Sequence, residues 1–198
     1  MPGDRKSDHP IDPMFIERWS PRAFTDEAIP DDTLASCFEA ARWAPSSMNA
    51  QPWRFIYSRR GSASWPTMLG LLLEFNRSWA QHAAALMVVA AKQTVVFNGK
   101  ELPSPTHAFD AGAAWIQFAL QAEKLGWHTH GMVGLDRDKA HVALGIPQSY
   151  SIIAAVAIGR QGDKSLLPPA LQEREVVSGR VPIEQFAFEG KFRSETNT

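Results

Sequence analysis

The sequence predicts one domain that mixes helices and strands, in the α/β or α+β class, around a central sheet. Segments with helical periodicity alternate along the chain with short apolar segments typical of strands. Residues 84–91 are continuously apolar, as expected of a strand covered on both faces, and residues 151–158 are predicted to be the clearest buried strand. A length of 198 residues, with 44% hydrophobic and 21% charged residues, fits a single soluble domain or one subunit of an intertwined oligomer.

The helices are predicted from apolar spacing and from residues that start or stop helices. Asp136 is placed to cap a helix over 137–144, and Gly126 to close the longest helix, which begins at His107. That longest helix is apolar on nearly every face, so a subunit interface is expected there. The other predicted helices are 14–19, one capped by Asp31 or Asp32 and running to about residue 42, and one opened by Ser64, interrupted at 76–79 and ending near His82.

The remaining chain is assigned to strands, loops and terminal segments. Residues 1–12 are expected to be a disordered lead, and 13–198 a single domain. Its C-terminal arm, about 178–192, carries three phenylalanines that are too apolar for a solvated tail, so we expect it to pack on a partner subunit. Strands are expected at 54–57, 84–91, 129–135 and 151–158, and loops at 99–106 and 159–169.

Charge and cysteine content exclude several classes of protein. A net charge of −1 argues against a nucleic-acid partner and against a polybasic membrane surface. Cys37 is the only cysteine, so no intrachain disulfide or thiolate metal cluster can form, and its helical spacing predicts a core position. Residues 1–10 have no apolar signal-peptide core, and no window resembles a membrane span. A cytoplasmic location is expected.

Several common catalytic and binding motifs are missing. The sequence has no G-x-G-x-x-G after a strand, no G-x-x-x-x-G-K-[ST], no G-x-S-x-G and no H-E-x-x-H. His128 and His130 alternate on a predicted strand, but no third ligand accompanies them, so no metal site is expected.

Two polar stretches are candidates for binding. Residues 41–55, A-R-W-A-P-S-S-M-N-A-Q-P-W-R-F, place hydroxyls and amides between two prolines, which suits a rigid binding loop or an ordinary helix-to-strand turn. Arg18, Ser20 and Arg22 alternate, so in an extended segment they would project the same way and suit an anion or a polar ring edge. The alternative for this second stretch is a solvated charged loop.

Four motifs in order resemble the FMN-dependent nitroreductase family over about residues 14–192. They are R-W-S-P-R-A-F at 18–24, the 41–55 loop, G-M-V-G-L-D at 131–136 and S-G-R-V-P-I-E-Q-F at 178–186. The resemblance implies an α+β fold, a nitroreductase-like three-layer α/β/α sandwich. Its central mixed, mainly antiparallel sheet is flanked by helices, and the protein is an intertwined homodimer with an exchanged C-terminal arm.

The same resemblance implies tightly bound, non-covalent FMN at the subunit interface, with NAD(P)H as co-substrate. Electrons would pass through the flavin N5 to a nitroaromatic, quinone, enone or aldehyde by a ping-pong mechanism. Alternatives are a relative with other flavin chemistry, such as reductive dehalogenation or flavin cleavage, and a non-enzymatic flavin-binding protein. The implied partners are a second copy of the chain and a small-molecule acceptor. The implied cofactor-binding residues are Arg18, Trp19, Ser20, Arg22, Pro45, Ser46, Ser47, Asn49, Asn76, Val133, Gly134, Ser178 and Arg180.

The family pattern also implies roles for these residues. No side chain is expected to be an acid or base, and Arg22 is expected to stabilise the charge of reduced flavin. The 45–49 loop would serve the flavin of the other subunit. Trp19, Val133 and Ser178 depart from the residues common at these positions, and Trp79 lies near a position where some members have a ring-contacting lysine. The 92–106 loop carries no signature that identifies a substrate.

Overall fold

A four-stranded antiparallel sheet forms the centre of the computed structural model, which describes residues 5–193. The strand order is β1-β2-β6-β5, and each of these neighbours pairs antiparallel. Residues 84–91 are all buried, so the predicted burial of β2 is confirmed. The strand predicted at 151–158 lies in β6, where Ser151, Ile153 and Ala154 are only partly buried. The strands span Trp53–Arg59 (β1), Ala85–Lys92 (β2), His128–Met132 (β5) and Tyr150–Gly159 (β6).

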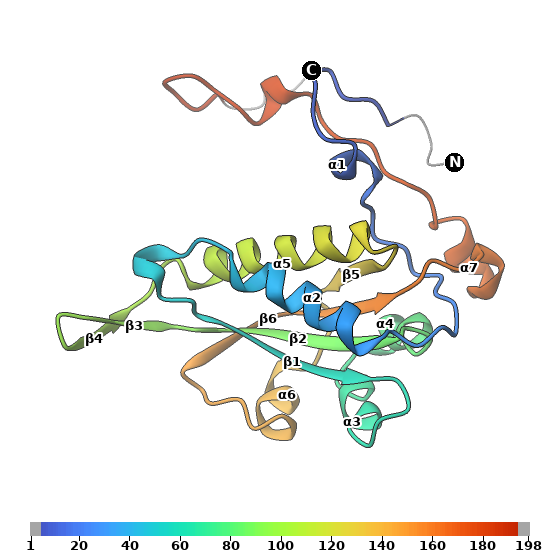
Figure 1. The fold of residues 1–198 in the computed structure, drawn as a ribbon, viewed down its shortest axis with the longest axis horizontal. Coiled ribbons are helices and arrows are strands. Elements are labelled where there is room, and N and C mark those ends of the chain that lie inside the picture. Colours follow the sequence, from blue (N-terminus) through green and yellow to red (C-terminus); the bar gives the residue numbers. More distant parts are fainter. Residues whose placement is uncertain (1–4, 194–198) are drawn as a thin grey trace.

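Helices cover both faces of the sheet and make the predicted three layers (Figure 1). On β2, Leu86 and Val88 face one core cluster whereas Met87 and Val89 face the other, which is the alternation expected of a strand buried on both sides. Helices α2 and α5 cover one face, and α3, α4 and α6 cover the other. They span Asp31–Arg42 (α2), Trp65–Leu69 (α3), Glu74–Ala80 (α4), His107–Lys124 (α5) and Arg137–Ala143 (α6).

The longest helix, α5, ends as predicted but is not buried all round within one chain. Gly126 follows it with φ +74°, a conformation that favours glycine, and the Gly126 amide bonds the carbonyl of Glu123. Phe118 is fully buried between α5 and the sheet, whereas Phe109 is 80% exposed and Ile116 41% exposed. The subunit interface on this helix stays a prediction.

Three local predictions are wrong. Asp31 lies inside α2 and pairs with Arg59, and Pro30 takes the cap position without a side-chain hydrogen bond. Ser64 precedes α3, but its hydroxyl contacts the hydroxyl of Ser58 and no amide of the helix. The break between α3 and α4 falls at 70–73, because residues 76–79 are helical.

The strand and loop boundaries also differ from those predicted. Residues 94–103 form a hairpin of β3 (Thr94–Phe97) and β4 (Lys100–Pro103) in place of a structureless loop. Its turn places Asn98 and Gly99 at positive φ, the combination that a tight hairpin turn requires. The strand predicted to reach residue 135 ends at Met132.

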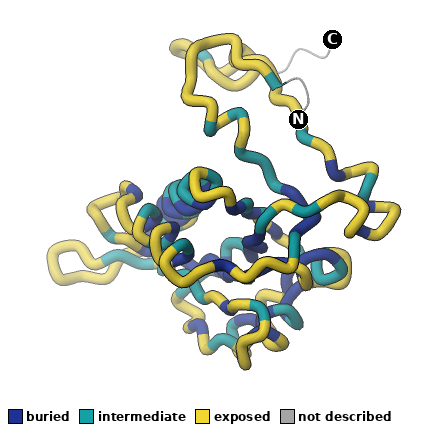
Figure 2. The backbone as a smooth tube through the Cα atoms, turned by 45° about the vertical axis from the view of Figure 1, so that its right-hand side comes forward, coloured by how far each residue is buried: buried dark blue, intermediate teal, exposed yellow. Residues whose placement is uncertain are grey.

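The two terminal segments leave the body of the domain together (Figures 1 and 2). Arg5 donates hydrogen bonds to the carbonyl oxygens of Ile16 (2.6 Å) and Arg18 (3.2 Å), so part of the predicted lead contacts the chain that follows it. The predicted arm is mostly exposed, including Phe186 and Phe192. The helical elements near the termini span Met14–Glu17 (α1), Lys164–Leu166 (η2), Pro169–Gln172 (α7) and Ile183–Gln185 (η3). Residues 1–4 of the predicted lead lie outside the described residues. No helix between residues 5 and 193 has the length and apolar character needed to cross a membrane.

Candidate functional site

The segment that follows α1 brings the first group of candidate residues to the C-terminal end of α5. Arg18 ends α1 with ψ 122°, and the chain then runs extended. Its Nη1 donates to the hydroxyl of Ser20 (3.3 Å), so these two side chains do project together. Trp19 points elsewhere and donates its indole N–H to Oε1 of Gln161 (3.1 Å).

Positive charge gathers where the two terminal segments meet. Burial lowers the pKa of Arg18, and the nearby charges of Arg180 and Arg5 lower it further. Arg180 also bonds the hydroxyl of Ser178 (3.1 Å), which places the two late candidates in the same cluster. Because like charges repel, a bound anion such as a phosphate would stabilise this arrangement.

Asn76 and Gly134 meet beyond the end of β5. The amide nitrogen of Asn76 donates to the carbonyl of Gly134 (3.0 Å), and the backbone N–H of Leu73 donates to the same oxygen (3.1 Å). A Cβ on Gly134 would lie 2.5 Å from that amide nitrogen, so a larger residue here would displace the Asn76 side chain. The neighbouring Val133 is 75% exposed.

Buried aromatic groups support this end of the domain from behind. His130 Nδ1 lies 3.0 Å from the carbonyl of Pro21, and its ring packs on Trp79 with centroids 4.7 Å apart. Burial is the main cause that lowers the pKa of His130. Trp79 is only 1% exposed, so it is a core residue and does not reach out where some family members place a lysine.

Arg22 is held by a residue that the sequence did not identify. The carboxylate of Glu175 accepts the backbone N–H groups of Arg22 (2.6 Å) and Ala23 (2.9 Å), and its second oxygen lies 3.6 Å from Arg22 Nη1. The Arg22 guanidinium therefore points toward Glu175. Nothing in the charged run 173–175 distinguishes Glu175 from Glu173 by type or spacing.

The 45–51 loop forms a second, separate group of candidates. The backbone N–H of Ser47 donates to the buried carboxylate of Asp110 (3.2 Å), and the Ser46 hydroxyl accepts the N–H of Gln51 (3.0 Å). Met48, Asn49 and Gln51 all have positive φ, which is costly for residues with a Cβ. Pro45 and Asn49 are exposed, so the loop presents its polar groups outward.

The chain as a whole resembles known proteins. Residues 16–64 and 70–160 match the nitroreductase family. The chain belongs to this family. Its fold is also that of solved relatives: a crystal structure of an oxidoreductase containing FMN is 47% identical, with a TM-score of 0.94 over 97% of this chain and 98% of that one.

Two relatives in sequence also match most of the chain. An uncharacterised 15.4 kDa protein of Mycolicibacterium smegmatis is 34% identical over 148 residues, which cover 70% of this chain and 97% of that protein. An NADH dehydrogenase of Thermus thermophilus is 26% identical over 201 residues, covering 86% of this chain and 91% of that protein.

Within this one chain, the 45–51 loop and the group around Arg18 lie apart. The 45–51 loop is tied to Asp110 in the first turn of α5, whereas Arg18 feels the charge of Glu123 near the other end of that helix. Thirteen residues of α-helix separate these two carboxylates, which is about 20 Å at 1.5 Å per residue. The chain does not bring the loop to the Arg18 group.

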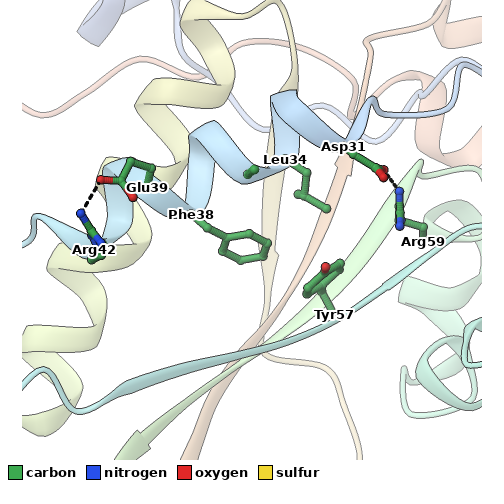
Figure 3. Close-up of a pocket in the computed structure, with 8 residues that line it drawn as sticks. Asp31, Leu34, Phe38, Glu39, Arg42, Tyr57 and Arg59 are labelled. Atoms are coloured by element: carbon green, nitrogen blue, oxygen red, sulfur yellow. Dashed lines mark ion pairs between the residues drawn. The ribbon is translucent and has the colours of Figure 1, made fainter.

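Two other features lie outside these groups. His128 is 3.7 Å from Glu123 whereas His130 contacts Pro21 and Trp79, and residues 5–193 hold no group of three potential metal ligands. A groove of about 470 Å³ runs between α2 and β1 (Figure 3), and its ends carry the ion pairs of Asp31 with Arg59 and of Glu39 with Arg42. None of the candidate cofactor residues lines this groove.

Proposed function

We propose that the protein is an FMN-dependent oxidoreductase that takes electrons from NAD(P)H and gives them to an electron-poor acceptor. Family membership supports this, as does the 47% identity to an oxidoreductase containing FMN over nearly the whole chain. The NADH dehydrogenase among the relatives supports a nicotinamide as the reductant. When bound, the flavin supplies the redox chemistry at its N5, and the protein supplies binding, orientation and charge.

The separation of the two candidate groups along α5 supports a cofactor site that is built from two subunits. If one cofactor needs both groups, a loop about 20 Å away in the same chain cannot serve it. The 45–51 loop of a second copy can do so if the two chains associate through α5. The exposed Phe109 and Ile116 on that helix, and the exposed aromatic side chains of the arm, are apolar surface that a homodimer would bury.

The described residues suit the parts of FMN in different ways. The guanidinium groups of Arg18 and Arg180 are charge-assisted donors for the phosphate. We assign Asn76 and Gly134 to the flavin ring, where the Asn76 amide would pair with the pyrimidine edge and the Gly134 backbone would approach N5. Arg22 carries a buried Nε without a hydrogen-bond partner in the described structure, a donor that a ligand could satisfy.

Cofactor content tests the proposal directly. Purified protein should be yellow and should release FMN on denaturation, because the cluster of arginines and the Asn76–Gly134 corner are already formed. Stopped-flow mixing with NADH or, in a separate experiment, with NADPH should bleach the flavin. Nitroaromatic, quinone, enone and aldehyde acceptors should then restore its colour. A colourless protein that takes up no added FMN would refute the proposal, and bleaching without reoxidation by any acceptor would indicate a different flavin chemistry.

Truncation tests the role of the arm. Deleting residues 181–198 should weaken the dimer and lower FMN occupancy, because the exposed aromatic side chains of the arm would no longer cover the partner. Analytical ultracentrifugation and the flavin-to-protein absorbance ratio measure the two effects. A truncated protein that is equally dimeric and equally loaded would contradict an exchanged arm.

A further inference from the structure

Glu175 is a buried carboxylate at the point where the C-terminal segment leaves the domain. Its side chain is 4% exposed, and it follows α7 by three residues. Transferring a carboxylate out of water is costly unless hydrogen bonds and an opposite charge compensate it. The cost of burying this carboxylate is not explained by packing of the hydrophobic core or by the proposed phosphate contacts.

The carboxylate of Glu175 contacts the segment that carries Arg22. Two backbone N–H groups, those of Arg22 and Ala23, converge on Oε1 at 2.6 and 2.9 Å. The Arg22 guanidinium approaches Oε2 at 3.6 Å and the carbonyl of Arg174 at 3.5 Å. Glu175 therefore fixes the backbone of this segment and the direction of its cation together.

The charge of Glu175 also acts on His130. Burial is the chief cause that lowers the pKa of His130, and Arg22 lowers it as well, whereas Glu175 raises it. A negative charge this close to Arg22 offsets part of the positive charge that Arg22 presents. Reduction of a flavin adds negative charge, so a less positive site makes reduction less favourable.

We propose that Glu175 is a positioning residue that aims Arg22 and reduces its effective positive charge, and that it thereby lowers the reduction potential of the flavin. This inference rests on the proposed function, because it concerns the cofactor of the same site. Glu175 itself touches neither substrate nor cofactor. It also links the origin of the arm to the segment that carries Arg22.

Glu175→Gln tests the charge and keeps most of the shape. The amide oxygen can still accept the two N–H groups, but the carboxylate charge is lost. With FMN bound, and with the protein equilibrated against a reference dye, the ratio of reduced to oxidised flavin should rise at least tenfold, which is about 30 mV for a two-electron couple. Glu173→Gln is the matched control, because Glu173 is exposed in the same run, and its ratio should stay within about twofold of wild type.

Hydrogen exchange of the cofactor-free protein gives a second measurement. The amides of Arg22 and Ala23 should stay protected in Glu175→Gln and lose protection in Glu175→Ala, because only glutamine offers an acceptor. If Glu175→Gln does not fold, Glu175→Asp replaces it. Aspartate keeps the charge but withdraws it by one methylene from Arg22, so the ratio should rise at least twofold.

The outcomes separate the two proposals. A wild-type protein that takes up no FMN overturns the proposed function and this inference with it. A folded, flavin-loaded Glu175→Gln protein with an unchanged ratio overturns only the role of Glu175. The same is true of equal shifts in Glu175→Gln and Glu173→Gln, since these would show a general effect of charge.

Discussion

Gly134→Ala is the substitution that most directly tests the corner beyond β5. The added Cβ would lie 2.5 Å from the Asn76 amide nitrogen and 3.5 Å from its Cγ. Asn76 must therefore turn away, and its hydrogen bond to the Gly134 carbonyl is lost. Since Gly134 does not have a positive φ, the effect comes from this contact and not from backbone strain.

The cost can be worked out from three contributions. Turning the end of the flexible Asn76 side chain costs little, and losing one hydrogen bond costs about 0.5–1.5 kcal/mol. Alanine restricts the unfolded chain, which offsets about 0.4–1 kcal/mol. The net loss is at most about 1 kcal/mol, and the melting temperature of a domain of this size should fall by at most about 4 °C.

Calorimetry of the FMN-free protein and titration with FMN measure the two consequences. We expect the melting temperature to fall as calculated and FMN to bind more weakly, because Asn76 no longer faces the cofactor. Gly131→Ala on β5 is the matched control, since its Cβ would lie 3.7 Å from Trp115, an ordinary contact. If Gly134→Ala is as stable as Gly131→Ala and binds FMN as tightly as wild type, the close approach has no role.

Three further predictions concern single side chains. Burial raises the pKa of the Cys37 thiol to about 11, so a disulfide reagent at pH 8 should label it only after unfolding, and rapid labelling of the native protein would contradict its burial. Asp136→Ala should cost about 1 kcal/mol in urea unfolding, because Asp136 accepts the Lys139 N–H at the start of α6, and an unchanged midpoint would refute that cap. Burial lowers the pKa of His130, so the native state disfavours a proton that the unfolded chain binds below about pH 6.5. The resulting stability is complete above that pH and is lost as the pH falls, and His130→Gln should flatten this decline in urea titrations from pH 7.5 to 5, whereas an equally steep decline would exclude His130.

Helix ends and strands that depend on residues close together in the chain could be predicted from the sequence. The Asp136 cap and the Gly126 stop are confirmed, because the groups that satisfy them lie within a few residues along the chain. The burial of β2 is confirmed for a similar reason, since a continuously apolar run is expected of a strand covered on both faces.

Polar residues with distant partners were harder to place. Asp31 and Ser64 are residue types that often cap helices. In the structure the Asp31 carboxylate pairs with Arg59, and the Ser64 hydroxyl contacts Ser58. The hairpin at 94–103 was missed because its strands are short and mostly exposed, which leaves little apolar alternation to detect. Glu175 was missed because burial of a carboxylate depends on amides that lie 152 or more residues away along the chain.

The sequence by itself determined the family and the identity of the candidate residues, because motif order and residue type survive without coordinates. Only the tertiary structure decided how those residues are grouped. It joined Asn76 to Gly134, tied Arg22 to Glu175, and anchored the 45–51 loop at the opposite end of α5 from Arg18. Such grouping depends on contacts between distant parts of the chain, which packing decides and local sequence does not.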